Sequence, residues 1–313
     1  MSQTLLLMGP LLPAIQDELE RDHEVHRHWE ADDPDALLER IGDSCTGVVT
    51  DGGRGVSPGV LAKLPKAKIV SVFGVGVDAV DLDWCREHGV RVANTPDVLS
   101  GDVADLAVAL ALAACRKLVE GDALVRRGDW ATKGGLPLTV RMFGRRAGIY
   151  GMGSIGSALA HRLEGFDMDI AYCNRSPRSG SPHRFVADLV ELARDVDFLF
   201  VTAAATAGTI GSVDAKVLDA LGESGWLVNV SRGTLVDEPV LIEYLREGRI
   251  AGAGLDVFAD EPHVPEGFRD LDNVVLQPHA ASGTHETRLA MGRLVLDNLA
   301  AHFDGRDPLT PVV

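Results

Sequence analysis

The feature of this sequence that most constrains its fold is a glycine-rich turn between a strand pattern and a helix pattern. The letters GMGSIG (151–156) follow the apolar run RRAGIY and precede SALAHRLEGF, which has helical spacing. In a chain so rich in glycine, chance alone gives about 0.4 matches to GxGxxG, so the motif by itself is weak. Its place between a strand and a helix is what makes it informative.

Each of the three glycines answers a steric need of a dinucleotide-binding unit. Gly151 permits a tight turn, Gly153 lets the backbone approach a pyrophosphate, and Gly156 lets the helix pack closely on the strand. The amides at the start of the helix would then face the phosphates. We therefore predict a dinucleotide site at this turn, with an ordinary strand–helix connection as the alternative.

Strand patterns alternate with helix patterns along almost the whole chain, which favours parallel sheets covered by helices. We expect strands in two runs, the first at 4–8, 47–50 and 67–73 and the second at 145–150, 167–173, 197–202, 225–230, 252–258 and 273–278. A single long helix is expected between the runs, from about Ser100 to Arg127. A last amphipathic helix, from about Thr284 to Phe303, is placed to return to the first unit and make it discontinuous.

Composition and charge exclude several classes of protein. Of the 313 residues 46% are apolar, which excludes a disordered chain, and the formal net charge of −16 argues against nucleic-acid binding. The N-terminal segment is a poor signal peptide, and the apolar run 103–114 is too short to cross a bilayer, so we expect no membrane partner. Four cysteines without a CxxC spacing predict reduced thiols, a cytoplasmic protein and no metal site.

Three segments of the second run place polar side chains where a strand meets a loop, the usual position of sites in open α/β sheets. Arg232 follows the strand GWLVNV, and His279 follows NVVLQP. Between them, Asp256 lies in a strand and Glu261 just beyond it. An arginine can hold a carboxylate through paired hydrogen bonds, and a histidine oriented by a carboxylate can give a proton to a carbonyl oxygen. The set is typical of 2-keto acid reduction.

Each of these residues also has an ordinary explanation. A lone arginine after a strand usually makes a surface ion pair, and a lone histidine before small residues is usually only a loop residue. Glu261 beside Asp260 would usually be solvated. Only their joint occurrence downstream of a nucleotide turn favours an active site.

Six segments match the pattern of a known family over nearly the whole chain: FGVGVDAVDL, VANTPDVLSGDVADLAVALAL, GIYGMGSIG, LVNVSRGTLVDE, AGLDVFADEP and NVVLQPHAASGT. On these motifs the chain resembles the D-isomer-specific 2-hydroxyacid dehydrogenases. Within that family it is most similar to the NADPH-dependent glyoxylate, hydroxypyruvate and hydroxyphenylpyruvate reductases. The resemblance implies an α/β enzyme with two Rossmann-like or flavodoxin-like domains, a discontinuous substrate domain (1–97 plus 285–313) and an NAD(P)-binding domain (98–284). It also implies a homodimer.

The resemblance implies a role for each site residue. Arg232 would hold the substrate's carboxylate and carbonyl oxygen, His279 would be the acid–base, and Glu261 its partner. Asp256 would bond to the nicotinamide carboxamide. The substrate would also meet a short loop, Phe73, Gly74, Val75 and Gly76. Further cofactor contacts would come from the glycine turn and nearby strand ends: Gly151, Gly153, Ser154, Ile155, Gly156, Asn174, Arg175, Ser176, Arg178, Thr202, Val230 and Ser282.

The segment YCNRSPRSG (172–180) lies where an NAD-binding unit usually ends its second strand with an acidic residue. Asn174 stands there instead, and it would not repel a 2′-phosphate. Arg175 can stack on adenine and bind the phosphate, with Ser176 and Arg178 as further donors. This pattern predicts NADPH as the cofactor, with NADH possible but less preferred. A solvated basic turn is the alternative.

Substrate choice and assembly leave alternatives open. Glyoxylate and hydroxypyruvate are the expected substrates, with hydroxyphenylpyruvate or 2-ketogluconate as larger ones, and the segment from Trp130 to Phe143 is a candidate to reach across a dimer. One rival is a non-catalytic nucleotide-sensing protein, which the complete catalytic set disfavours. A second rival, a hydrolase of the adenosylhomocysteine type, would need an acidic residue at 174. The loop AAATAGTIG (203–211) departs from the family's usual Pro-containing loop.

Overall fold

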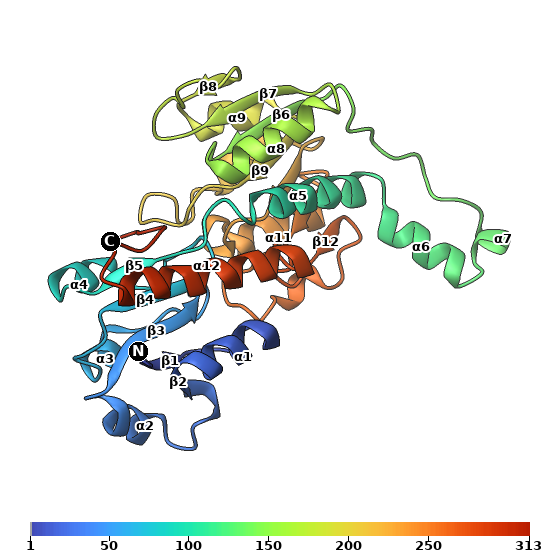
Figure 1. Cartoon of the computed structure of the whole chain (residues 1–313). Coiled ribbons are helices and arrows are strands. Elements are labelled where there is room, and N and C mark those ends of the chain that lie inside the picture. Colours follow the sequence, from blue (N-terminus) through green and yellow to red (C-terminus); the bar gives the residue numbers. More distant parts are fainter. Residues whose placement is uncertain (1) are drawn as a thin grey trace. The chain divides into compact units, whose positions relative to one another are not determined.

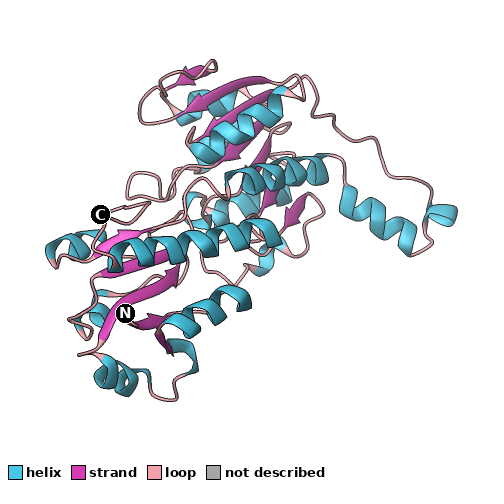
Figure 2. Cartoon of the chain, viewed as in Figure 1, coloured by secondary structure: helices cyan, strands magenta, loops and turns pink. Residues whose placement is uncertain are grey.

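The computed structural model describes residues 2–313 and divides the chain into two compact units. Unit 1 is Met1–Leu99 together with Ser282–Val313, and unit 2 is Ser100–Ala281. Each unit is built on one parallel sheet covered by helices (Figures 1 and 2). The predicted α/β class with two parallel sheets is therefore confirmed.

Unit 1 contains a five-stranded parallel sheet in the order β2-β1-β3-β4-β5. Its strands are β1 (Thr4–Leu7), β2 (Glu24–Arg27), β3 (Cys45–Asp51), β4 (Ile69–Phe73) and β5 (Arg91–Ala93). This is the flavodoxin-like strand order. Sequence patterns did not reveal β2 or β5, because β2 is polar and only partly buried and β5 is only three residues long.

The helices of unit 1 cover both faces of its sheet; they are α1 (Pro13–Asp22), α2 (Pro34–Ile41), α3 (Pro58–Ala62), α4 (Leu82–Glu87) and α12 (His285–Phe303), with a short 3₁₀ turn, η1 (His28–Glu30). Helix α12 packs on β4 and α1, where a Cβ on Gly292 would lie 2.4 Å from Ile15. The helix begins where the Thr284 hydroxyl accepts a hydrogen bond from the Thr287 amide. Helices α2 to α4 share an apolar core with the other face of the sheet.

Unit 2 contains a seven-stranded parallel sheet in the order β12-β11-β10-β9-β6-β7-β8. Its strands are β6 (Arg146–Tyr150), β7 (Asp169–Cys173), β8 (Arg184–Val186), β9 (Phe198–Val201), β10 (Trp226–Asn229), β11 (Gly252–Leu255) and β12 (Val274–Leu276). The strand order reverses between β6 and β9, and ligands of such sheets bind at the carboxyl ends of the strands beside that point. Tyr150 pairs with Cys173 and with Val201, so β6, β7 and β9 end at one level.

Helices pack on both faces of this second sheet; they are α5 (Ser100–Cys115), α8 (Ser154–Glu164), α9 (Leu189–Asp195), α10 (Ala215–Leu221) and α11 (Glu238–Glu247), with 3₁₀ turns η2 (Gly233–Leu235) and η3 (Glu266–Phe268). Helices α5 and α8 contact each other on one face. A Cβ on Gly254 of β11 would lie 2.8 Å from Leu110 of α5, so glycine permits this close approach. The neighbouring side chains of Ala253 and Leu255 point to the opposite face, into the core shared with α9 to α11.

The single long helix expected from Ser100 to Arg127 is wrong. Helix α5 ends at Cys115, Lys117 adopts a left-handed conformation with φ of 51°, and a separate helix, α6 (Leu118–Arg126), follows. The Cys115 carbonyl accepts a hydrogen bond from the Val140 amide (3.2 Å), so a distant segment takes the place of the next helical turn. No glycine or proline marks this break, and a long-range contact decides it.

The segment 118–143, which we call the arm, leaves α5 and extends away from the sheet of unit 2 (Figure 1). It contains α6 and a short helix, α7 (Trp130–Lys133). Its large apolar side chains are unusually exposed; they are Leu118, Val119, Val125, Trp130, Leu136, Leu138, Val140 and Phe143. So much exposed apolar surface on one segment is typical of a surface that binds another protein.

The four cysteines, Cys45, Cys85, Cys115 and Cys173, are all buried and free. Burial raises the pKa of each thiol to about 11. The thiols are therefore poor nucleophiles at neutral pH. Within residues 2–313 no helix has the length and apolar character needed to cross a bilayer.

Candidate functional site

The glycine turn after β6 is crowded at two of its three glycines and open at the third. Gly151 has φ of 107°, and a Cβ there would lie 2.4 Å from the Ala203 amide nitrogen. A Cβ on Gly156 would lie 2.2 Å from the Gly151 carbonyl oxygen. A Cβ on Gly153, by contrast, would meet no protein atom within 4 Å. The turn therefore needs glycine at 151 and 156 for its own packing, and at 153 it leaves free space.

The start of α8 suits an anion. Gly153 is its N-cap residue and no side chain caps it, so the amides of the first turn, beginning at Ser154 and Ile155, lack a side-chain acceptor. Helix N-termini with free amides bind phosphate groups through these donors and the helix dipole. Together with the open space at Gly153, this end of α8 fits the pyrophosphate of a dinucleotide.

Three predicted cofactor residues bind the turn itself. The Asn174 side-chain oxygen accepts a hydrogen bond from the Met152 amide (2.7 Å), and the Arg178 guanidinium donates to the Met152 carbonyl oxygen (2.9 Å). The Thr202 hydroxyl donates to the Gly151 carbonyl oxygen (2.7 Å). These bonds hold the turn between the ends of β7 and β9.

The structure brings His279 and Glu261 into direct contact. His279 Nδ1 lies 2.6 Å from Glu261 Oε2, and the other carboxylate oxygen accepts from the Phe258 amide (3.0 Å). Burial pushes the pKa of Glu261 upward, but the hydrogen bonds from His279 and Phe258 outweigh it and hold the pKa below its usual range. An ionised carboxylate only accepts, so Nδ1 carries the proton and Nε2 is the ring atom left for a ligand. The His279 side chain is 40% exposed.

His279 is one of the few non-glycine residues with a left-handed backbone, with φ of 52°. Asp256 holds that conformation, because its carbonyl oxygen accepts from the His279 amide (2.8 Å) and its carboxylate accepts from the amides of Ala280 (2.7 Å) and Ala281 (3.0 Å). Left-handed strain costs about 1–3 kcal/mol, and bonds to a charged acceptor are worth about 1.5–3 kcal/mol each, so the two carboxylate bonds offset it.

Asp256 has a structural task that its expected role did not include. The residue has no exposed surface, and both of its carboxylate oxygens are occupied by backbone amides. Burial raises the pKa of its carboxyl, and the two amide bonds oppose this. In the structure Asp256 therefore holds the loop that carries His279, and its bond to a nicotinamide carboxamide stays a prediction.

Arg232 lies directly after β10 and close enough to Glu261 for its charge to lower the pKa of that carboxyl. Its guanidinium donates to the Ser231 carbonyl oxygen (2.8 Å), and its own carbonyl oxygen accepts from Asn229 (2.9 Å). A Cβ on the next residue, Gly233, would lie 1.9 Å from the Phe258 carbonyl carbon. The segment carrying Arg232 thus packs directly on the segment leading to Glu261. Val230, by contrast, is buried in the core, 6% exposed.

Glu238, the first residue of α11, was not predicted as a site residue. It is 7% exposed, and its carboxylate accepts from the Ala259 amide (2.8 Å). Burial raises the pKa of this carboxyl, and the nearby charges of Glu261 and Asp260 add to the effect. An acidic residue in the first turn of a helix is normally solvated, so nothing in the sequence marks it as buried.

In unit 1, the predicted substrate loop follows β4. Phe73 is only 8% exposed, while Gly74 accepts a hydrogen bond from the Thr95 amide (2.8 Å) and Val75 accepts one from the Asn94 side chain (2.8 Å). Among residues 2–313, the amides of Val75 and Gly76 have no acceptor. Two adjacent free N–H groups form a simple anion-binding element. Ser282 is half-buried and lies at the start of the returning segment of unit 1.

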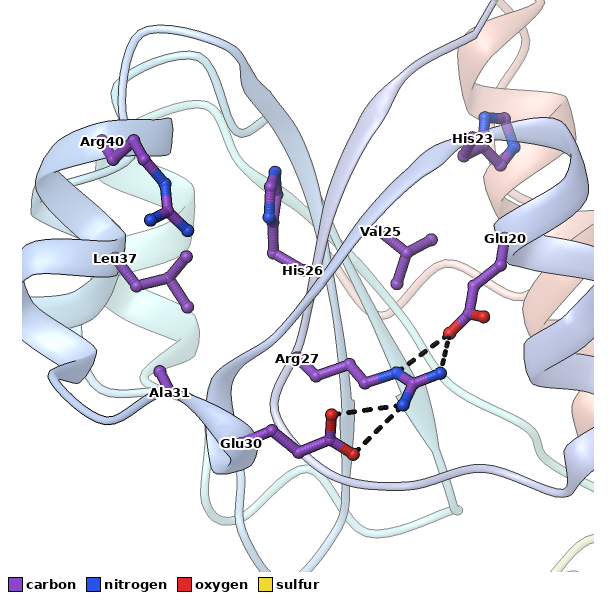
Figure 3. A pocket seen from close by; sticks show the side chains of 9 residues that line it. All are labelled: Glu20, His23, Val25, His26, Arg27, Glu30, Ala31, Leu37 and Arg40. Carbon is purple, nitrogen blue, oxygen red and sulfur yellow. Dashed lines mark hydrogen bonds and ion pairs between the residues drawn. The ribbon is translucent and has the colours of Figure 1, made fainter.

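A separate hollow of about 520 Å³ lies at the β2 edge of unit 1, between α1, β2 and α2 (Figure 3). It contains none of the predicted site residues. Its Arg27 guanidinium is shared by Glu20 (3.0 and 2.6 Å) and Glu30 (3.1 and 3.2 Å), as the dashed lines in Figure 3 show. Its central cation, Arg27, is thus already paired with two carboxylates.

Comparison with known proteins confirms the family suggested by the motifs. Residues 108–281 match the family described as D-isomer specific 2-hydroxyacid dehydrogenase, NAD binding domain. The chain is 46% identical over 309 residues to glyoxylate/hydroxypyruvate reductase A of Arabidopsis thaliana, covering 99% of this chain and 98% of that protein. It is equally similar, with the same coverage, to hydroxyphenylpyruvate reductase of Plectranthus scutellarioides.

A solved structure shows the same fold over the full chain. It is an NADPH-dependent glyoxylate/hydroxypyruvate reductase from Sinorhizobium meliloti, in complex with NADP and malonate. The two chains are 40% identical, with a TM-score of 0.95, over 100% of this chain and 97% of the other.

We expect Gly153→Ala to fold normally but to bind a nicotinamide dinucleotide about tenfold or more weakly, a loss of about 1.4 kcal/mol or more. The added methyl group meets no protein atom, and φ of −87° suits alanine, so the methyl only fills the space through which a pyrophosphate would approach. Thermal denaturation measures folding, and fluorescence titration with the reduced dinucleotide measures binding.

Gly156→Ala is the contrasting variant, because its methyl group would press on the Gly151 carbonyl oxygen and should lower the melting temperature as well. Unchanged dinucleotide binding by Gly153→Ala would show that the dinucleotide binds elsewhere.

Proposed function

Because the chain belongs to the D-isomer specific 2-hydroxyacid dehydrogenase family and is thus an oxidoreductase, we propose that it reduces small 2-keto acids to D-2-hydroxy acids with NADPH. Glyoxylate and hydroxypyruvate are the proposed substrates. The observation that carries the proposal is the 2.6 Å bond between His279 and Glu261, in the unit that also holds the glycine turn. A histidine whose tautomer is set by a carboxylate is suited to proton transfer.

His279 is the proposed proton donor. A reduced nicotinamide held at the glycine turn would supply hydride to the keto carbon. Protonated Nε2 of His279 would give its proton to the carbonyl oxygen, which becomes the hydroxyl of the product. Glu261 keeps the ring oriented and stabilises its positive charge while the proton is held. The neutral imidazole left behind regains a proton from solvent.

Arg232 and the loop after β4 are the proposed anchors of the substrate. The guanidinium would bind the carboxylate and polarise the carbonyl, which places negative charge on oxygen at lower cost. The amides of Val75 and Gly76, which lack acceptors, would bind the carboxylate. Both anchors require an anionic 2-keto acid, so a neutral carbonyl compound would bind poorly.

NADPH is the proposed cofactor, with NADH less preferred. The chemistry of the β7 end supports it, because Asn174 lacks the negative charge that would repel a 2′-phosphate. Arg175 and Ser176 are exposed beside it, and Arg175 has no partner among residues 2–313. The similar S. meliloti enzyme, described as NADPH-dependent and bound to NADP, adds support.

A larger 2-keto acid is the second candidate substrate. It is favoured by the equal similarity to a hydroxyphenylpyruvate reductase, and 2-ketogluconate is a further option. A non-catalytic nucleotide sensor is less well supported, since it would have no need of the His279–Glu261 pair. Steady-state assays with glyoxylate, hydroxypyruvate, hydroxyphenylpyruvate and 2-ketogluconate, each with NADPH and NADH, distinguish these functions.

A cytoplasmic homodimer is the proposed assembly. The arm exposes large apolar side chains, including Leu138, Trp130 and Phe143, that a second copy of the chain would cover. Four buried free thiols are typical of a protein from a reducing compartment. Sedimentation velocity on the intact chain measures the assembly directly.

We expect His279→Ala to lower kcat for glyoxylate reduction by about 10²–10⁴-fold, the usual contribution of a general acid. The dissociation constant for NADPH should change little, because the hydrogen bonds that His279 makes within residues 2–313 go to Glu261 and Asp256 and not to the glycine turn. His263→Ala is the matched control, since His263 is 79% exposed in the same loop as Glu261. Near-normal turnover by His279→Ala would contradict the assignment.

Arg175→Ala should raise the KM for NADPH about tenfold or more and leave that for NADH nearly unchanged. This loss of NADPH affinity corresponds to one or two charge-assisted hydrogen bonds to a phosphate. Arg184→Ala removes an exposed arginine from the neighbouring strand β8 and serves as the control for net charge. Equal effects of Arg175→Ala on the two cofactors would refute phosphate recognition by this residue.

A further inference from the structure

The loop that follows β7 is fixed at two points to buried parts of unit 2. At one point, Asn174 accepts from the Met152 amide and Arg178 donates to the Met152 carbonyl oxygen, so both polar groups of a buried residue in the glycine turn are bound by this loop. At the other point, the Arg178 amide donates to the Tyr172 hydroxyl (2.9 Å). The loop is therefore closed on itself between Tyr172 and Arg178.

Tyr172 is a rigid support for this closure. It lies in β7, is only 2% exposed, and packs against the ring of Phe185 in β8 with centroids 5.6 Å apart. Its hydroxyl is thus held by a packed ring, and a buried tyrosine normally keeps such a partner. Arg178 is consequently held by its backbone and by its guanidinium at once.

The residues between these fixed points are the ones suited to a 2′-phosphate. Arg175 and Ser176 are exposed and make no hydrogen bond to residues 2–313. In a sheet of this strand order, the end of the second strand is where the ribose of the dinucleotide binds. A cation on a closed loop loses less conformational entropy when it binds phosphate than one on a mobile loop.

We infer that Tyr172 is a positioning residue for NADPH selectivity: its hydroxyl holds Arg178 and so preorganises the 174–178 loop for the 2′-phosphate. The inference deepens the proposed function and rests on its NADPH preference. The Tyr172 hydroxyl bonds to Arg178, whereas the bonds to Met152 come from Asn174 and Arg178, so we expect its effect on the loop to exceed that on the part of the site common to NADPH and NADH.

The test is Tyr172→Phe, which keeps the packed ring and removes only the acceptor of the Arg178 amide. Fluorescence titration should show NADPH binding weakened about three- to tenfold, the size of one hydrogen bond, with NADH binding changed less than twofold. Hydrogen exchange of residues 174–178 without cofactor should become faster. Tyr244→Phe is the matched control, because it removes a buried tyrosine hydroxyl from the same unit that bonds to Asp219 and Ala215 instead.

Two outcomes would overturn the inference. Unchanged NADPH binding would show that the hydroxyl does not position the loop, and equal weakening of NADPH and NADH would show a general structural role. The Arg175→Ala variant distinguishes a wrong role for Tyr172 from a wrong assignment of NADPH preference. If wild type prefers NADPH and Arg175→Ala removes the preference while Tyr172→Phe keeps it, only the role of Tyr172 is wrong. If wild type binds both cofactors equally, the proposed cofactor preference fails.

Discussion

Tight backbone packing at the glycine turn, residues 151–156, is the constraint on which the site of unit 2 depends. Gly156 sits against the Gly151 carbonyl, and Gly151 sits against the backbone of Ala203. The end of β6, the residues after β9 and the start of α8 are thereby packed backbone against backbone. The Gly151 carbonyl and the Met152 amide then find partners on neighbouring strand ends, in Thr202 and Asn174. Among the three glycines of the motif, Gly153 has open space beside it, and a ligand is expected there.

Three carboxylates lie around the histidine, and their environments give them different tasks. Burial raises the pKa of the Asp256 carboxyl although two backbone amides donate to it, and through these bonds Asp256 acts on the loop conformation. Glu238 is buried and accepts a hydrogen bond from the Ala259 amide, and burial raises the pKa of its carboxyl. Glu261 alone meets the imidazole, and that bond holds its pKa down. Of the three, Glu261 is the carboxylate placed to stabilise a protonated histidine.

The two units use the same architecture in different ways. In unit 2, polar side chains such as Arg232 and His279 lie in the loops that follow the strands. Unit 1 ends β4 with a loop whose backbone amides lack acceptors, at Val75 and Gly76. Proton transfer is proposed for unit 2, and carboxylate binding by backbone amides for unit 1.

Much of this protein was determined by its sequence alone. The period of the apolar residues gave the nine expected strands and the parallel class, and the spacing of the glycines located the turn, because both follow from local backbone geometry. The residue types at strand ends pointed to His279 and Glu261, since parallel strands bring their carboxyl ends to one edge. Tertiary structure alone decided that the helix breaks at Lys117 and that Glu238 is buried. It also decided that the Asp256 carboxylate accepts from backbone amides and that the Arg178 amide donates to the Tyr172 hydroxyl. Each of these depends on which distant group occupies the neighbouring space, and no local pattern records that.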